Sequence, residues 1–366
     1  MSVRAAPQII VANGSLRSAG FRERVLAARE AGFDGFGIHV RDYAHLRSTG
    51  WTDADLRAVL RDNGFDLIEI ETVLGWDDPP ERRNTDGLHR EQLAFELADA
   101  VGARHVMAVG ALTGEPRETA AEGFAGLCER AADHGLLVAL EPQACSTIAD
   151  LRSAVAIVRT AGRPNGGLNL DIWHATRGAW PRAELAALNG HEIMVVQIDD
   201  GPMEPVTDDY LAECTHYRTA PGEGEFDIAG FLSTAYGTGT TAPVSVEVMS
   251  DELDDLPVQT AAVRPRQPAA SFLGRADVDL GAVFPTTQIG TDPAVIRDVA
   301  QTADRTGVEW PVLAEWGRRW RLRAVLTRAL DLVEERFGAV TRVQPVELDA
   351  RVTRFLEGSG HGLARQ

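Results

Sequence analysis

At 366 residues, with 44% hydrophobic and 25% charged residues, the chain has the composition of an ordinary globular protein with a sizeable core. Its formal net charge of −18 opposes binding to nucleic-acid phosphates or anionic membranes, which basic residues drive, and favours a small-molecule partner. All 36 basic residues are Arg, so Schiff-base lysine chemistry and a P-loop lysine are excluded.

The spacing of the cysteines and the length of the apolar segments predict the cellular compartment of the protein. Cys128, Cys145 and Cys214 are far apart and form no C-x-x-C pair, so the sequence predicts neither a disulfide framework nor a thiolate zinc site. The apolar run near the N-terminus is too short for a signal peptide, and no apolar stretch reaches the roughly 18 to 20 residues of a membrane helix. We therefore expect a cytoplasmic protein with no membrane segment.

Eight short β-rich segments alternate with amphipathic segments over the first 250 residues. The predicted strands are 8–13, 35–40, 66–72, 105–110, 136–141, 167–172, 193–198 and 243–248. Apolar residues recur at helical spacing between them, for example over 147–161 after the capping candidate Ser146. Such alternation implies parallel strands joined by right-handed crossovers, and eight units predict a (β/α)8 TIM barrel over residues 1–265. The competing doubly wound sheet would carry a G-x-G-x-x-G turn after its first strand, and that spacing is absent.

Beyond Ser250 the sequence changes in character. "VRPRQPAAS" is interpreted as a helix running into a linker, followed over 266–366 by a C-terminal, mainly helical appendage. From about residue 272 this appendage resembles the opening β/α unit of luciferase-like monooxygenases, which suggests a docked remnant or an oligomerisation arm in a homo-oligomer. Its "WGRRWRLR" run interleaves Arg with Trp, for which we favour an amphipathic helix packed on the acidic barrel over a nucleic-acid contact.

Polar residues occupy the same place in four successive predicted strands. Side chains at i and i+2 share one face of a strand, and in each of these strands the other face is apolar and suited to covering by helices. The polar face ends in Glu141, Asp171, Gln197 and Glu247, respectively. We expect these side chains to point inward at the C-terminal mouth of the barrel, where barrel enzymes hold their active sites.

Three converging carboxylates and an amide predict a metal site. Like charges a few ångströms apart repel strongly in a site of low dielectric constant, and a divalent cation removes that repulsion. Oxygen donors suit Mn²⁺ or Mg²⁺, with Co²⁺ as a further candidate, better than zinc. A single strand-end carboxylate more often caps a helix or pairs with Arg, but four equivalent positions favour the metal. His174, one turn after Asp171, is expected to reach over the metal, with a backbone-bonded loop histidine as the alternative.

Several motifs over residues 8–265 resemble the sugar phosphate isomerase/epimerase family of xylose isomerase-like TIM barrels. They are "ALEP", "LDIWH", "VQIDDGP", "RTAPGEGEFD" and "VSVEV". The resemblance implies metal ligands at Glu141, Asp171, Gln197 and Glu247. Sugar epimerases commonly have His as the third ligand, and Gln197 is instead similar to the 3-dehydroshikimate dehydratases. Those dehydratases tend to have a His where this chain has Gln143.

The resemblance also implies a mechanism, namely proton abstraction beside a carbonyl with the metal stabilising the enediolate. Glu141 and Glu247 would be the base and the acid, and His174 would hydrogen-bond or shuttle a proton to a substrate oxygen.

Four further residues are candidates for substrate binding. Arg218, in a lid-like loop, would clamp a hydroxyl, carboxylate or phosphate group, with a surface arginine as the alternative. Glu71, Trp76 and His39 follow or end predicted strands, and ordinary core or mouth lining is an equal interpretation for them.

The sequence therefore favours a metal-dependent isomerase or epimerase of a sugar, polyol or cyclic hydroxy-ketone. A metal-dependent lyase that removes water or an aglycone after the same enolisation is the alternative, and a non-catalytic binding protein is the alternative of another class. The endonuclease branch of the family is disfavoured by the charge of −18 and by the scarcity of histidines in ligand-like motifs.

Overall fold

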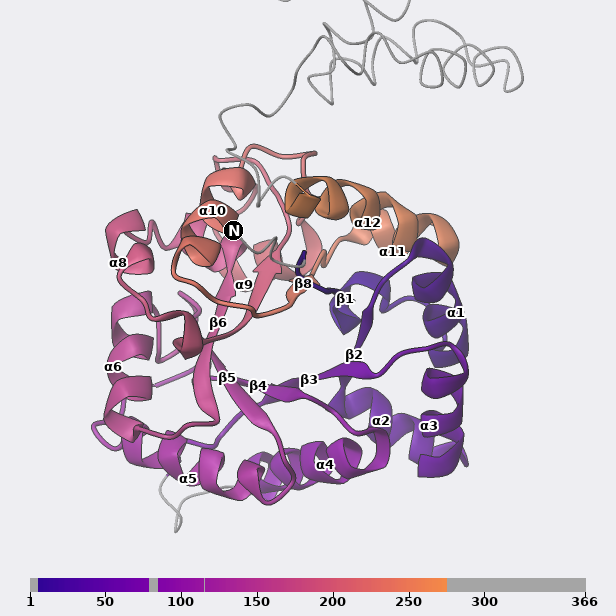
Figure 1. Cartoon of the computed structure of the whole chain (residues 1–366), viewed down its shortest axis with the longest axis horizontal. Coiled ribbons are helices and arrows are strands. Elements are labelled where there is room, and N and C mark those ends of the chain that lie inside the picture. Colours follow the sequence, from indigo (N-terminus) through magenta and orange to yellow (C-terminus); the bar gives the residue numbers. More distant parts are fainter. Residues whose placement is uncertain (1–5, 79–84, 115, 275–366) are drawn as a thin grey trace, which may run out of the picture. The chain divides into compact units, whose positions relative to one another are not determined.

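The computed structural model describes residues 6–78, 85–114 and 116–274, which form a closed barrel of parallel strands in the order β1 to β8 (Figure 1). The strands are β1 (Ile9–Val11), β2 (Gly35–His39), β3 (Leu67–Val73), β4 (His105–Val109), β5 (Leu137–Glu141), β6 (Gly166–Asp171), β7 (Ile193–Ile198) and β8 (Val244–Val246). Each lies within one residue of, or inside, a segment expected from the sequence. The predicted TIM barrel is confirmed.

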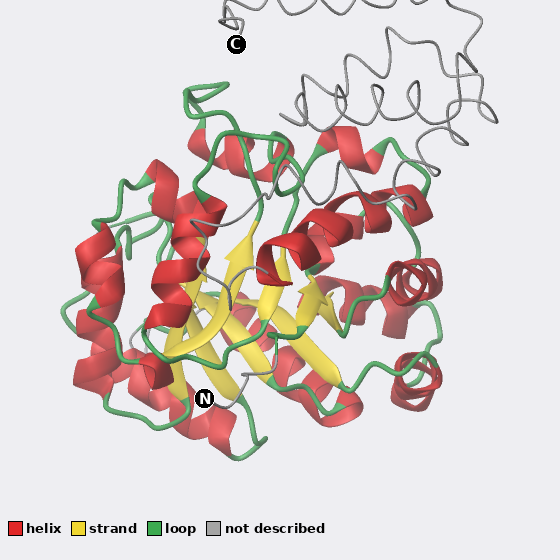
Figure 2. Ribbon diagram, turned by 45° about the horizontal axis from the view of Figure 1, so that its top comes forward, coloured by secondary structure: helices red, strands yellow, loops and turns green. Residues whose placement is uncertain are grey.

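The strands form the inner barrel, and the helices lie around its outside (Figure 2). The α-helices are α1 (Phe21–Ala31), α2 (Val40–Ser48), α3 (Asp53–Asp62), α4 (Thr85–Val101), α5 (Ala120–Ala132), α6 (Leu151–Ala161), α7 (Ile172–Arg177), α8 (Arg182–Ala186), α9 (Tyr210–His216), α10 (Ile228–Gly237), α11 (Asp251–Asp254) and α12 (Val258–Gly274). Two short 3₁₀ helices, η1 (Asn13–Leu16) and η2 (Gly190–Glu192), complete the described elements.

The two faces of the strands differ as their sequences predict. Residues such as Val138, Leu170 and Val196 are buried in the large hydrophobic core between strands and helices. The lumen holds a small apolar cluster around Met107 and Val195. Polar residues such as Glu69 and Asn169 share the lumen, and β5 and β6 end in the carboxylates Glu141 and Asp171.

Helix α6 begins later than the sequence suggests. Its N-cap is Asp150, whose carboxylate accepts a hydrogen bond from Ser153 N at 2.8 Å. The Ser146 hydroxyl instead donates to the carbonyl of Ile148 at 3.0 Å and accepts from Ile148 N at 3.1 Å, which closes a turn in the preceding loop. A serine hydroxyl stabilises turns and helix starts in the same way, so the sequence pattern did not separate the two positions.

The segment "VRPRQPAAS", expected to be a helix that runs into a linker, is helical throughout, so the linker part of that prediction was wrong. Helix α12 runs through it, including Pro265 and Pro268, because its buried face, with Ala262 and Ala269, packs on the barrel. Arg266 donates to the carbonyl of Gly32 at the end of α1, at 2.9 Å. Tertiary contacts of this kind outweigh the helix-breaking tendency of proline.

The chain divides into a unit of residues 1–281 and a unit of residues 282–366. The expected boundary at residue 265 falls within α12, and the rest of the expected C-terminal appendage, beyond residue 274, lies outside the described residues. Its resemblance to a monooxygenase unit and the "WGRRWRLR" run stay predictions. Among the described residues, no helix combines the length and apolar character needed to cross a membrane.

An ion pair joins α6 to η2, directly before β7, and it allows a test of stability. Arg159 donates two hydrogen bonds to Glu192, at 2.7 and 3.0 Å. These bonds lower the pKa of Glu192 from its usual 4.5 to about 2. A carboxyl whose pKa is lowered by folding stabilises the fold above its unfolded pKa and loses that contribution as the pH falls through its folded pKa.

We therefore expect Glu192→Gln to lower the free energy of unfolding at pH 7, measured in urea. The difference from the parent should shrink as the pH falls from about 4.5 to about 2. Glu204→Gln, at an exposed position, is the control and should change stability at neither pH. An equal loss at pH 7 and pH 2 would contradict the assignment.

Candidate active site

The four predicted metal ligands come together at the mouth of the barrel. Glu141 and Asp171 are the last residues of β5 and β6, Gln197 lies one residue from the end of β7, and Glu247 directly follows β8. All four are buried, and Asp171 and Gln197 are direct partners across neighbouring strands. The inward orientation inferred from strand alternation therefore agrees with the structure.

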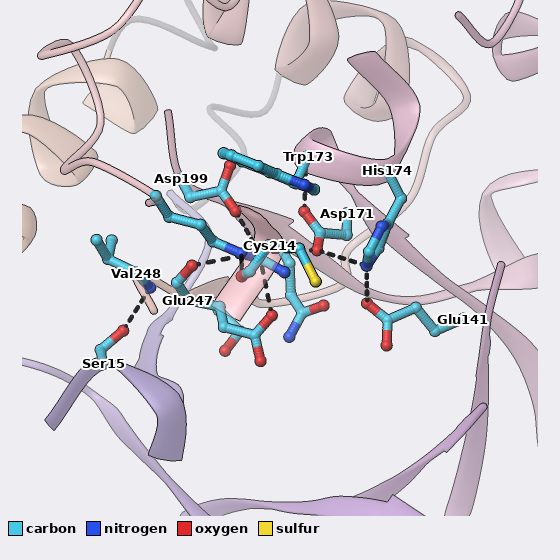
Figure 3. Close-up of polar contacts among 12 residues, drawn as sticks. Ser15, Glu141, Asp171, Trp173, His174, Asp199, Cys214, Glu247 and Val248 are labelled. Atoms are coloured by element: carbon cyan, nitrogen blue, oxygen red, sulfur yellow. Dashed lines mark hydrogen bonds and ion pairs between the residues drawn. The ribbon is translucent and has the colours of Figure 1, made fainter. Parts of the chain in front are cut away.

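Glu141, Asp171 and His174 form the tightest group (Figure 3). His174 Nε2 lies 3.5 Å from Glu141 Oε1 and 3.4 Å from Asp171 Oδ2. One potential ligand atom from each of the three side chains lies within 4.8 Å of the others. Glu141 Oε1 and His174 Nε2 are buried without a hydrogen-bond partner among the described residues.

Each of the two carboxylates uses one oxygen for positioning and presents the other. Asp171 Oδ1 accepts from Trp173 N at 2.8 Å and so caps α7, which leaves Oδ2 facing His174. Glu141 Oε2 accepts from Gln143 Nε2 at 2.8 Å, which leaves Oε1 facing His174. The loop after β5 and the first turn of α7 therefore fix the direction of the two oxygens that face His174.

Arg218 connects the remaining carboxylates. Its Nη1 lies 3.0 Å from Asp171 Oδ2 and 3.2 Å from Glu247 Oε2, and it also pairs with Asp199. Its Nε donates to the carbonyl of Cys214 in α9 at 2.8 Å. The side chain is 1% exposed, so the sequence's alternative of a surface loop arginine is wrong.

Burial dominates the electrostatics of the mouth. It raises the pKa of Glu141 and of Asp199 well above the usual range, and that of Glu247 to about 7, with help from neighbouring carboxylates. Burial also lowers the pKa of His174 to about 4, so the imidazole is neutral at pH 7. Four carboxylates thus share one guanidinium, and full ionisation of the cluster is unfavourable.

This arrangement fits a divalent cation. A cation beside Glu141 and Asp171 would supply the positive charge that the cluster lacks, and the unpartnered Glu141 Oε1 gives it a free ligand atom. Asp171 Oδ2 contacts Arg218, but a carboxylate oxygen accepts more than one interaction. The arginine pairs therefore leave the cation site open on the Glu141 side.

Gln197 is held by residues inside the lumen. Its Oε1 accepts a short hydrogen bond from Asn169 Nδ2, and its Nε2 contacts the Met107 sulfur at 3.5 Å. Its amide oxygen has a second lone pair, so the predicted ligand role stays a prediction.

The loop after Arg218, expected to be lid-like, is tied to the barrel by Asp200. The Asp200 carboxylate accepts hydrogen bonds from the backbone of Gly201, Gly222 and Phe226, at 2.8 to 2.9 Å. A side chain at Gly224 would collide with the same carboxylate, which explains the glycine. The loop is therefore fastened at several points.

The other substrate-binding candidates have structural contacts. Glu71 Oε1 accepts from Asn13 N at 2.6 Å, His39 Nδ1 accepts from Arg41 N and caps α2, and Trp76 Nε1 donates to Val109 O. Trp76 is 1% exposed in the hydrophobic core. These are contacts of core and mouth-lining residues, the interpretation that the sequence left open beside substrate binding.

Two residues at the site were not assigned a role from the sequence. Asp199 shares a strand face with Gln197, which was a usable signal, and it completes the set around Arg218. Tyr210 hydrogen-bonds His174 Nδ1 at 2.6 Å. It lies 36 residues along the chain in a different helix, and no spacing rule connects the two.

Comparisons with known proteins agree with this architecture. The family model described as "Xylose isomerase-like TIM barrel" matches residues 25–270. A solved fusion protein of a xylose isomerase-like TIM barrel and a 4-hydroxyphenylpyruvate dioxygenase superposes with a TM-score of 0.68 and 24% identity, covering 76% of this chain and 44% of that one. The IolI protein, solved with a bound zinc atom, superposes with a TM-score of 0.66 and 20% identity, covering 74% and 99%.

Two groups of curated relatives are similar in sequence. A 3-dehydroshikimate dehydratase of Pseudomonas aeruginosa is 31% identical over 247 residues, which are 66% of this chain and 38% of the relative. An inosose isomerase of Halalkalibacterium halodurans is 29% identical over 240 residues, 63% of this chain and 83% of the relative. The chain thus matches less than half the length of the dehydratase.

Removal of Arg218 should leave buried carboxylates without their counter-charge. We expect Arg218→Gln to lower the free energy of unfolding at pH 7 by about 3–5 kcal/mol, since breaking a buried ion pair leaves an uncompensated charge. Arg182→Gln, which breaks an exposed pair with Asp227, is the matched control and should cost at most about 1 kcal/mol. If urea titrations gave the same loss in free energy of unfolding for both variants, the stability of the carboxylate cluster would not depend on Arg218.

A cation held by Glu141 and Asp171 should stabilise the chelator-treated protein. At Mn²⁺ concentrations about 100 times the dissociation constant, the free energy of unfolding should rise by about 2.7 kcal/mol. Glu141→Gln should remove this gain in thermal melts and calorimetry. The control is Glu69→Gln, because Glu69 is buried deeper in the lumen against Ser245 and His105. An unchanged Mn²⁺ response in Glu141→Gln would exclude Glu141 as a ligand.

Proposed function

The chain belongs to the xylose isomerase-like TIM barrel family, and from this premise we propose that it is an enzyme that removes a proton from the carbon beside the carbonyl of a small hydroxy-ketone. The observation that carries the proposal is the buried cluster of Glu141, Asp171 and Glu247 with His174 and Arg218 between them. A cluster of perturbed acids and bases at the mouth of a TIM barrel is typical of an active site.

A divalent cation is part of this proposal, with oxygen ligands from Glu141, Asp171, Gln197 and Glu247. When bound, it would polarise the carbonyl and stabilise the negative charge that develops on its oxygen. Mn²⁺, Mg²⁺ and Co²⁺ suit these donors. Zinc joins them as an ion to be tested, because the IolI structure holds a zinc atom.

The protein's own groups have distinct roles. Glu141 and Glu247 come from strands separated by β6 and β7, so one can remove a proton while the other returns it from another side. The pKa of Glu247, raised to about 7, is close to the pH at which a general acid or base is most efficient. His174 and Arg218 would bind substrate oxygens and hold the carbonyl in place.

Cyclic hydroxy-ketones are the proposed substrate class. The curated relatives are named for inosose and 3-dehydroshikimate, and both names denote six-membered ring ketones with a hydroxyl group beside the carbonyl. A small neutral or weakly charged ring agrees with a binding site that is rich in carboxylates and holds one guanidinium. Sugars and open-chain polyol ketones share the same carbonyl and hydroxyl pair.

Isomerisation or epimerisation is the proposed outcome, and dehydration is the second candidate. Both begin with the same proton abstraction, but dehydration also needs a proton for the departing hydroxyl. Gln143 donates to Glu141 Oε2 at 2.8 Å, and its neutral amide has no acidic proton to transfer, which favours isomerisation. The 31% identity to a 3-dehydroshikimate dehydratase favours the second candidate.

The deciding experiment incubates the full chain with Mn²⁺ in D₂O and either inosose or 3-dehydroshikimate, followed by mass spectrometry and NMR. An isomerase or epimerase gives a product that carries solvent deuterium and otherwise has the elemental formula of the substrate. A dehydratase gives a product lighter by one water, which from 3-dehydroshikimate is aromatic. Intact Mn²⁺ binding without exchange or turnover across a panel of hydroxy-ketones would overturn the enzymatic proposal in favour of a binding protein.

Glu247→Gln tests the assigned acid–base chemistry. The variant should lose about 10²–10⁴-fold in kcat, because general acid–base catalysis contributes that much, while its circular dichroism and melting curve stay those of a folded barrel. Chelator should abolish turnover of the parent, and Mn²⁺ should restore it. Retained activity in Glu247→Gln would remove Glu247 from the mechanism.

A further inference from the structure

Helices α7 and α9 are joined by two side-chain contacts with matching spacing. His174 Nδ1 lies 2.6 Å from the Tyr210 hydroxyl, and Arg177 makes two bonds of 2.9 and 3.1 Å to Glu213. The partners are three residues apart in each helix, so both pairs lie along the same helix–helix contact. The rings of His174 and Tyr210 are nearly parallel, at 22°. The position of the phenol is therefore set by the packing of α9.

We propose that Tyr210 is a positioning residue that holds His174 in the tautomer with its proton on Nε2, so that His174 acts as a hydrogen-bond donor and not as a metal ligand. The donor role towards a substrate oxygen rests on the proposed function. The tautomer itself does not.

The hydrogen bond at His174 Nδ1 favours this tautomer. Burial raises the pKa of Tyr210, so the phenol keeps its proton at neutral pH. Among the described residues, the hydrogen-bond partner of this hydroxyl is His174 Nδ1. A phenol that donates to Nδ1 requires a lone pair there. The proton of the neutral imidazole is then on Nε2.

The environment of His174 Nε2 favours the same tautomer. That atom faces Glu141 Oε1 at 3.5 Å and Asp171 Oδ2 at 3.4 Å. An N–H group in this position is attracted to the two carboxylates, whereas a lone pair is repelled by them. Both ends of the ring therefore favour the same tautomer.

The tautomer decides how the cluster of Glu141, Asp171 and His174 is used. A nitrogen that carries a proton has no lone pair for a cation, so Glu141 and Asp171 would hold a cation here through their carboxylate oxygens, without His174. The Nε2–H group is then available to a ligand oxygen bound beside the cation. His174 and the metal would thus act on the substrate from separate positions.

The test uses the metal-free full chain labelled with ¹⁵N-histidine, with His174 assigned by its loss in His174→Gln. Long-range ¹H–¹⁵N correlation NMR distinguishes the two tautomers. We expect the Nε2–H pattern in the parent, and we expect it to persist after addition of Zn²⁺, which is diamagnetic. Tyr210→Phe should shift His174 towards a mixture of tautomers. His174→Gln should keep the Mn²⁺ affinity of the parent in calorimetry.

Two control variants separate positioning from packing. Glu213→Gln weakens the second α7–α9 contact but keeps the phenol, so it should lower stability without changing the His174 tautomer. Tyr217→Phe removes an exposed phenol just after α9 and should change neither property.

An Nδ1–H pattern in the parent, loss of the Nε2 proton on Zn²⁺ binding, or an unchanged tautomer in Tyr210→Phe would overturn the proposal. The zinc measurement uses the parent chain, so it stands even if Tyr210→Phe does not fold. Absence of turnover with every ketone would overturn the proposed function and leave the tautomer result intact.

Discussion

The structure of the mouth depends on the charge of one buried guanidinium. Arg218 contacts Asp171, Asp199 and Glu247, and without it these carboxylates would face one another in a site of low dielectric constant. The arginine does not neutralise the cluster, because Glu141 faces the same mouth. The remaining negative charge is what makes the site suited to a divalent cation. The same guanidinium thus makes the acidic cluster compatible with a folded barrel and leaves it attractive to a metal.

Much of the fold could be predicted because strand alternation is a local property. Strands β5 to β8 each have an apolar face for the helices and a second face with a polar residue at or near its end, and they repeat this pattern at equivalent positions. Contacts that this repeated pattern does not relate could not be predicted. The burial of Arg218, the bond between Tyr210 and His174 and the helical course of α12 through Pro265 and Pro268 all depend on neighbours that the barrel brings together. Local patterns contain no information on these neighbours.

In Glu141 and Asp171 the two oxygens of the carboxylate have different partners, and this difference is as informative as the residue types. Glu141 accepts a hydrogen bond from Gln143 in the following loop, and Asp171 accepts one from Trp173 in the first turn of α7. Each presents its other oxygen to the mouth. A carboxylate fixed in this way loses little freedom when a ligand binds. Gln143 therefore orients Glu141 through its side-chain amide.

The loop that carries Arg218 is fastened to the end of β7 by Asp200, through bonds to Gly201, Gly222 and Phe226. A loop held through its backbone amides is preorganised, because it loses its conformational entropy when the chain folds and not when a substrate binds. Discrimination between substrates at this side of the mouth would then come from the shape and charge already present in the resting protein. Binding on the Arg218 side should accordingly be rapid and resemble the docking of a rigid ligand to a rigid surface.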